Sequence, residues 1–119
     1  MAISLQHEHD NVFRMEISGV LLERDFTAVQ RSLAPELEGA RRIRLLVMLN
    51  AFEGWEAAAT WRNLGFYVRH GARIERIAIV GDDRWKAEAL MFAAADLRDA
   101  PVAFFGAVHA AQARAWLSH

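Results

Sequence analysis

Two apolar segments without alternation constrain the fold more than any other feature of this sequence. In Ile43–Leu49 and Ile74–Val80, apolar side chains fall at successive positions and lack the period of two expected for a half-exposed strand. Strands of this kind are typical of parallel sheets that are covered by helices on both faces. The sequence therefore predicts an α/β architecture with a layered core.

The N-terminal part predicts a hairpin and then a helix. Apolar and polar residues alternate from Ile3 to His7 and from Phe13 to Ile17, with turn-forming Asp10 and Asn11 between them. We expect Gly19 to end the hairpin. A helix should then carry Phe26, Val29, Leu33 and Leu37, with a kink or a restarted turn near Leu33 because Pro35 lies inside the pattern.

The remaining segments alternate between helices and strands. Helical spacing is expected from Trp55 to Arg69 and from Trp85 onward, and a final strand over Val102–Phe105 should precede a terminal helix that carries Val108, Ala111, Ala115 and Trp116. The resulting order is ββαβαβαβα. This order predicts a single mixed β-sheet with helices packed against it.

Composition limits the function classes. With 119 residues, 54% of them apolar, the chain fits one domain over residues 1–119. Its 14 basic and 15 acidic residues do not supply the positive field of a dedicated nucleic-acid binder. It has no cysteine, no signal-peptide pattern at its start and no apolar stretch near the ~20 residues of a membrane span. A cytoplasmic protein is expected.

A constellation in the middle of the chain resembles a known family. The sequence Phe-Glu-Gly-Trp occupies residues 52–55, then come Trp61, Phe66 and His70, and later Ile-Ala-Ile-Val-Gly-Asp at 77–82 with Trp85. Together with the element order, these residues resemble the SpoIIAA-like family of the STAS-type group, which is also compared with lipid-carrying CRAL-TRIO domains. The resemblance implies a small cytoplasmic α/β protein, often a homodimer, that binds a hydrophobic ligand or associates with membranes.

The phosphorylation switch of the related anti-sigma-factor antagonists does not carry over. Those STAS proteins have a phosphorylated serine at the start of the helix after the central strand. Here residues 52–55 contain no hydroxyl group, and Thr60 is the nearest one. Met48 also stands where the family has an acidic residue. A constant charge on Glu53 could mimic a phosphate but could not switch.

The ends of the two apolar segments predict a binding cleft. Ligand sites of open α/β sheets lie at the carboxyl ends of parallel strands, and apolar walls with a few polar groups suit a small ligand. The alternative is that the tryptophans belong only to the core. The predicted ligand-binding residues are Asn50, Phe52, Glu53, Trp55, Trp61, Phe66, Gly81, Asp82 and Trp85.

Catalytic and metal-binding patterns are weak. The chain lacks a nucleophile elbow and a phosphate-binding loop. Glu53 and His70 would lie at opposite ends of one helix, roughly 22 Å apart, so they cannot act as a pair. His70 suits a helix C-terminus, with a general base or a ligand contact as the alternative. His7 and His9 have no obvious third ligand for zinc. We expect no catalytic residue, metal or cofactor.

Arginines form the last candidate surface. Arg62, Arg69 and Arg73 could contact a membrane or a ligand anion, although interleaved acids also fit an ordinary solvated helix face. The preferred prediction is a non-enzymatic module that binds a small hydrophobic or amphiphilic ligand, with peripheral membrane contact as an option. The alternative is a STAS-type regulatory protein–protein interaction module without the phosphorylatable serine.

Overall fold

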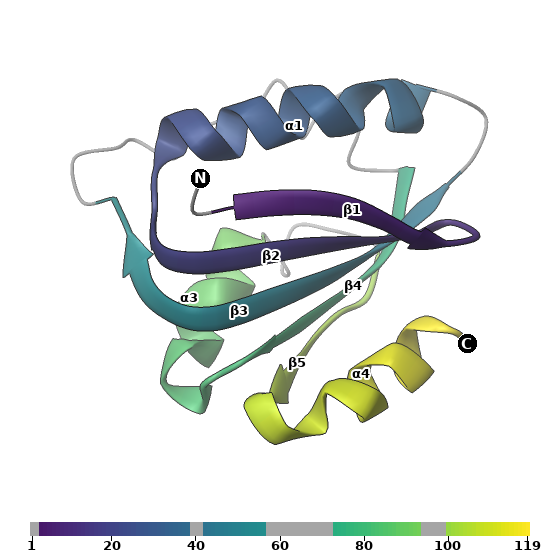
Figure 1. Ribbon diagram of the computed structural model, residues 1–119. Coiled ribbons are helices and arrows are strands. Elements are labelled where there is room, and N and C mark those ends of the chain that lie inside the picture. The colour runs from purple at the N-terminus through teal and green to yellow at the C-terminus, as the bar shows by residue number, and fades with distance from the viewer. Residues whose placement is uncertain (1–2, 39–41, 57–72, 94–99) are drawn as a thin grey trace.

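Five strands form one mixed sheet in the computed structural model, which describes residues 3–38, 42–56, 73–93 and 100–119. The hairpin of β1 and β2 is antiparallel, whereas β2, β3, β4 and β5 run parallel to one another (Figure 1). The predicted mixed α/β sheet is confirmed. In the order of the sheet, the strands are β1 (Ile3–His9), β2 (Val12–Leu21), β3 (Ile43–Trp55), β4 (Ile74–Gly81) and β5 (Val102–Gly106).

Three described helices cover the two faces of this sheet. α1 (Glu23–Glu38) and α3 (Lys86–Phe92) lie on one face, and α4 (Ala110–Leu117) lies on the other (Figure 1). The helix predicted for residues 55–69 lies outside the described residues except at its start. Otherwise the described elements follow the predicted order.

Strand β4 shows why the apolar segments do not alternate. Ile77 and Ile79 join a core cluster that contains Leu33 of α1, whereas Ala78 and Val80 pack with Leu117 of α4 on the opposite face. All four β4 side chains are buried. Because both faces of the strand are covered from Ile77 to Val80, these four successive positions are apolar, as the sequence predicted.

The hairpin differs from its prediction at Gly19. Asp10 has a φ of 46° in the two-residue turn, which an aspartate tolerates better than most residues. Gly19, with a φ of 63°, does not end β2. The pairing register between β2 and β3 shifts on either side of Gly19, and β2 continues to Leu21. The glycine therefore accommodates a bulge inside the strand.

Helix α1 also differs from expectation. It is continuous from Glu23 to Glu38, with Pro35 inside its last turn, so the restarted turn predicted near Leu33 is wrong. A proline removes one backbone donor and crowds the preceding turn. Only the last few residues of α1 follow Pro35, so little of the helix depends on the lost hydrogen bond.

The terminal helix begins later than predicted. Val108 lies in a short 3-10 turn, Ala107–His109, and is 89% exposed. Ala113 and Leu117 form the buried side of α4, and Trp116 packs beside them against Phe105. Ala111 and Ala115 are exposed.

Candidate functional site

The central strand is longer than its sequence suggests. Leu49 was the predicted end of β3, with a helix starting at Trp55, but the strand continues through Trp55. This extension, Asn50–Trp55, pairs with Gly19–Leu21 of β2. The prediction of a strand-end loop and helix start at residues 50–55 is therefore wrong, because a partner strand holds these residues extended.

Two extra residues of β3 make the extension irregular. Between the pairs Ile17–Leu49 and Gly19–Phe52, β3 advances by one residue more than β2, and another extra residue follows before Gly54. Ala51 has a φ of 51° and Gly54 a φ of 112°. These bulges bend and re-aim a strand, which is a common device beside binding sites.

Gly54 also makes room for an aromatic ring. A Cβ at this position would lie 3.4 Å from Cη2 of Trp85, in a backbone region that residues other than glycine rarely adopt. Trp85 comes from the 3-10 turn Asp83–Trp85 directly after β4. The extension of β3 and the turn after β4 are thus in direct contact, as expected for neighbouring parallel strands.

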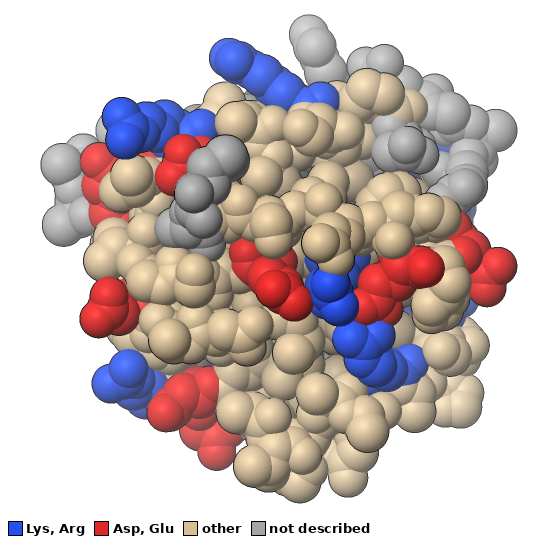
Figure 2. Space-filling model, in the orientation of Figure 1, with Lys and Arg blue, Asp and Glu red and all other residues tan. Residues whose placement is uncertain are grey.

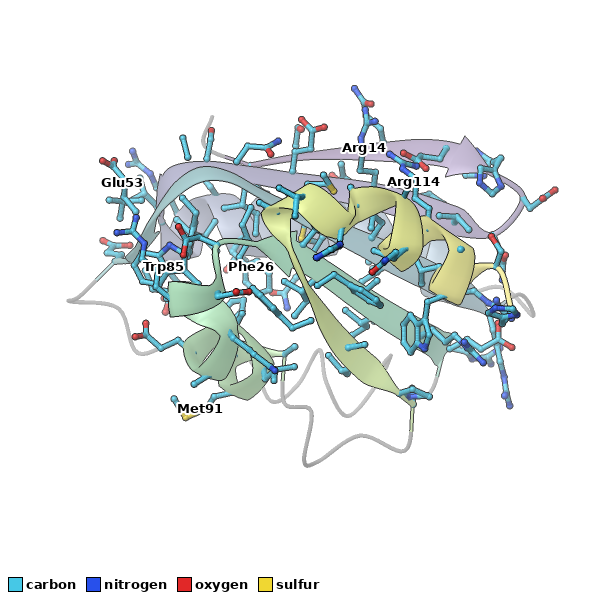
Figure 3. All side chains as sticks on the ribbon, turned by 90° about the horizontal axis from the view of Figure 1, so that it is seen from below. Arg14, Phe26, Glu53, Trp85, Met91 and Arg114 are labelled. Atoms are coloured by element: carbon cyan, nitrogen blue, oxygen red, sulfur yellow. The ribbon has the colours of Figure 1, made fainter. Side chains whose placement is uncertain are left out.

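Five aromatic side chains form a cluster at this end of the sheet. The ring centroids of Phe52 and Trp55 are 4.8 Å apart, those of Phe52 and Trp85 5.1 Å, and those of Trp55 and Trp85 5.9 Å, all with edge-to-face geometry. Phe92 of α3 lies 5.5 Å from Trp55 and 5.0 Å from Phe26 of α1. We call these five residues the aromatic cluster. Figure 3 shows Trp85 and Phe26 near the end of the sheet that carries Glu53.

Burial separates the roles of these rings. Phe52 is 4% exposed and belongs to the core, together with Leu21 and Val29. Trp55 and Trp85 are only partly buried and pack against that core from its edge. The core interpretation of the predicted site therefore applies to Phe52, and the two tryptophans lie at the boundary between core and surface.

One polar atom in the cluster lacks a hydrogen-bond partner among the described residues. The indole Nε1 of Trp55 is buried, and no group in the described part of the chain accepts a hydrogen bond from it. Tryptophan N–H groups usually find an acceptor when buried, because an unsatisfied donor costs about 1–3 kcal/mol.

The other predicted residues divide into structural and exposed positions. Asp82 caps the 3-10 turn by accepting the backbone N–H of Arg84 at 3.0 Å. Gly81 is buried, and a Cβ there would lie 2.9 Å from Cβ of Leu49, so it is needed for close packing of β3 and β4. Asn50 and Glu53 are exposed at the rim of the site.

Two charged contacts near the site were not predicted. A carboxylate oxygen of Glu56 accepts the backbone N–H of Glu23 at 3.0 Å and caps α1. The guanidinium carbon of Arg84 lies 5.0 Å from the ring centroid of Trp85, which is within range of a cation–π contact. The first contact joins residues far apart in sequence, and no local motif signals it.

Several arginines anchor α4 and are not free surface cations. Arg44 donates to the carbonyl oxygens of Leu117 and His119 and pairs with Glu75 at 3.1 Å. Arg76 donates to the carbonyl oxygen of Trp116 at 2.8 Å, and its guanidinium lies 5.0 Å from that ring. Cations at a helix C-terminus satisfy its last carbonyls and its negative dipole end.

The third charged contact of α4 involves the hairpin. The carboxylate of Glu8 accepts one hydrogen bond from Arg114 and another from Arg14. The second joins Nη1 of Arg14 and Oε1 of Glu8 at 3.3 Å. The hydrogen bond from Arg114, with smaller contributions from the charges of Arg114 and Arg14, lowers the pKa of Glu8 below its ordinary value. Figure 3 shows Arg14 and Arg114 side by side, and Figure 2 shows acidic and basic residues interleaved on the face it presents.

Most of the predicted cation patch and of the aromatic residues predicted for the second helix fall beyond the described part of the chain. Arg73 is described and is partly buried. The predicted residues Trp61, Arg62, Phe66, Arg69 and His70 lie outside the described residues, as does Thr60.

Histidines at the hairpin take part in local contacts. Nε2 of His7 lies 2.6 Å from the carbonyl oxygen of Asp10, and the ring of His7 packs on Phe13 with centroids 4.8 Å apart. Within residues 3–38, 42–56, 73–93 and 100–119, no three histidine, aspartate or glutamate side chains are grouped so that they could hold a metal ion.

Comparison with known proteins places the chain. A family model described as SpoIIAA-like matches residues 12–118, which include all of the site. The chain belongs to the SpoIIAA-like family. A crystal structure of an uncharacterised protein from Shewanella loihica with a SpoIIAA-like fold superposes with a TM-score of 0.73 and 24% identity, covering 98% of this chain and 92% of that one. This likeness confirms the fold. A search of curated proteins gives no match.

The described helices of the chain are α1, α3 and α4. None of them is long and apolar enough to cross a bilayer.

Proposed function

We propose that this SpoIIAA-like protein is a non-enzymatic module that binds a small hydrophobic or amphiphilic molecule at the aromatic cluster. The observation that carries the proposal is the contact between Trp55 and Trp85. Their ring centroids are 5.9 Å apart, yet both residues are only partly buried. Large aromatic rings at the rim of a core offer apolar area to a ligand without requiring a new cavity in the centre of the protein.

The position of the cluster supports this function. Trp55 ends β3 and Trp85 follows β4, so both lie at the carboxyl ends of adjacent parallel strands. Open α/β sheets bind ligands outside the carboxyl ends of their strands, most often where the strand order reverses. The cluster meets the first condition, whereas the order β2-β3-β4-β5 follows the chain. The bulges at Ala51 and Gly54 further support a site, since they aim the extension of β3 toward Trp85.

The polar groups at the site favour binding over catalysis. The carboxylate of Asp82 is engaged in capping a turn, and that of Glu56 caps α1. Asn50 and Glu53 stand exposed at the rim, where they could orient the polar end of an amphiphile. Peripheral membrane contact would then bring such a ligand to the site, with Arg73 as the described candidate for contact with lipid head groups.

Native mass spectrometry of freshly purified protein tests the proposal. We expect a species heavier than the bare chain, and denaturing extraction should release an apolar or amphiphilic molecule of the matching mass. The unloaded protein should regain a bound species when it is incubated with a medium-chain amphiphile such as decanoate. If it is purified gently, carries nothing and takes up no amphiphile, the proposed function is wrong.

A regulatory protein–protein interaction module is the second candidate. The observation that favours it is the exposed surface beside the extension of β3, where Val20 is 43% exposed and pairs with Gly54. Exposed Ala51 and Glu53 lie on the same extension. A pull-down with Glu53→Lys as the control would support this function if a single partner is captured by the wild type and lost by the variant. Equal capture by both would count against it.

A further inference from the structure

The unpartnered N–H group of Trp55 restricts the kind of ligand that the site can take. We propose that the ligand presents a hydrogen-bond acceptor oxygen to Nε1 of Trp55 while its apolar part packs on the aromatic cluster. This inference rests on the proposed function and goes beyond it by naming the head group. It starts from a buried donor that no described group satisfies.

The chemistry of the donor decides which head groups fit. An indole nitrogen donates one hydrogen bond and accepts none, so a carbonyl, ester or carboxylate oxygen is complementary to it. An alkylammonium head group carries only donors and leaves the N–H unsatisfied. A ligand with an acceptor therefore removes a cost that the unliganded protein bears, whereas a ligand without one does not.

Charge around the cluster does not select strongly for either sign. Glu53, Asp82 and Asp83 are exposed near the ends of β3 and β4, and Arg84 and Lys86 are exposed beside Trp85. The fields of these acidic and basic groups partly cancel, and salt screens such exposed charges further. The acceptor at the head group, more than its net charge, should thus decide affinity.

Access to the N–H group requires a side-chain adjustment. Nε1 of Trp55 is closed to solvent, and the rings of Phe52 and Trp85 meet Trp55 edge to face. Phe52 is fixed in the core, whereas Trp85 is partly exposed and lies on a single 3-10 turn. Of these two neighbours Trp85 is the one that can rotate more readily, and side-chain rotations of this kind are common on binding.

Three probes with the same chain length test the inference: 2-decanone, decanoate and decylammonium. The protein has four tryptophans, so a ¹⁵N-labelled sample gives four indole N–H signals, and Trp55→Phe assigns the one of interest. We expect 2-decanone and decanoate to move the Trp55 signal downfield and to slow its exchange with solvent. Decylammonium should bind at least about fivefold more weakly than these two probes, as expected for the loss of one net hydrogen bond.

Two variants make the test specific. Trp55→Phe keeps an aromatic ring and removes the donor, so affinity for 2-decanone should fall about fivefold while affinity for decylammonium stays unchanged. Trp116→Phe is the matched control, because Trp116 packs with Phe105 on the opposite face of the sheet. It should leave both affinities unchanged.

The outcomes separate this inference from the proposed function. If decylammonium binds as tightly as 2-decanone and Trp55→Phe does not change their ratio, the acceptor inference is wrong, although the site still binds amphiphiles. If none of the three probes binds, the proposed function itself is wrong.

Discussion

The side-chain carboxylate of Glu56 accepts the backbone N–H of Glu23 at a distance of 3.0 Å. This hydrogen bond ties the end of the β3 extension to the first turn of α1. The backbone N–H of Glu56 donates to the carbonyl oxygen of Leu21 at 2.9 Å. Two hydrogen bonds of Glu56 therefore join the end of β3 to the segment that runs from β2 into α1. The position of the segment that carries Trp55 is therefore coupled to the start of α1.

Glu56→Ala should destabilise the protein by about 1 kcal/mol. The substitution removes an acceptor for one of the free N–H groups at the start of α1 and a negative charge near the positive end of the helix dipole. Urea unfolding followed by circular dichroism measures the loss. Glu53→Ala is the control, since Glu53 is exposed on the same extension, and it should change the free energy of unfolding by less than about 0.5 kcal/mol. Equal effects of the two substitutions would contradict the capping role.

Ala51→Gly should stabilise the protein by roughly 0.5–1 kcal/mol. Ala51 is exposed and has a φ of 51°, where an L-residue is strained by about 1–2 kcal/mol, and glycine avoids that strain at a smaller entropic cost. Ala111→Gly provides the contrast, because Ala111 is exposed within α4 and its replacement should cost about 1 kcal/mol. A loss of stability in Ala51→Gly would show that the backbone at this bulge differs from the one described.

These positions also show how far the sequence could predict the structure. The apolar segments around Leu46 and Ala78 predicted two-sided strands correctly, because burial on both faces is a local property of each strand. The extension of β3 was missed since Gly54 reads as a turn residue, and only its pairing with Val20 of β2 keeps it extended. Local sequence does not reveal a partner strand.

The candidate site shows the same limit. The sequence correctly brought Trp55 and Trp85 together, because adjacent parallel strands deliver their ends to one edge of the sheet. It could not distinguish the buried Phe52 from its partly exposed neighbours, nor foresee the role of Glu56. Burial of single rings and long-range caps depend on how α1 and α3 pack, which is decided by tertiary contacts.

Gly81→Ala should cost about 1–3 kcal/mol. The new methyl group would lie 2.9 Å from Cβ of Leu49, an atom that cannot move without the strand itself, so the core would be overpacked. Thermal unfolding measures this loss. Gly106→Ala is the matched control at the end of β5, where the nearest atom is 3.4 Å away on the exposed side chain of His109. A similar loss in both variants would indicate a general effect of removing glycine, not a clash with Leu49.

The contact between Glu8 and Arg114 should make stability depend on acidic pH. The hydrogen bond from Arg114 holds the pKa of Glu8 below its ordinary value of 4.5. The contribution to stability is therefore fully present above about pH 4.5 and is lost as the pH falls through the folded-state value. Glu8→Gln should flatten the fall in the free energy of unfolding as the pH is lowered below about 4.5. An unchanged slope in that variant would assign the pH dependence to other carboxylates.

Binding and folding measured together on Trp55→Ala test the central claim most directly. Titration with decanoate, followed by near-ultraviolet circular dichroism and urea unfolding of the same sample, separates a binding wall from a core residue. We expect the variant to unfold cooperatively and to lose decanoate binding, whereas Trp116→Ala keeps it. The stability loss of Trp55→Ala should be about 3 kcal/mol, the low end for a tryptophan truncation, because Trp55 is only partly buried. A folded Trp55→Ala protein that binds decanoate as the wild type does would contradict the claim, as would a variant that no longer folds.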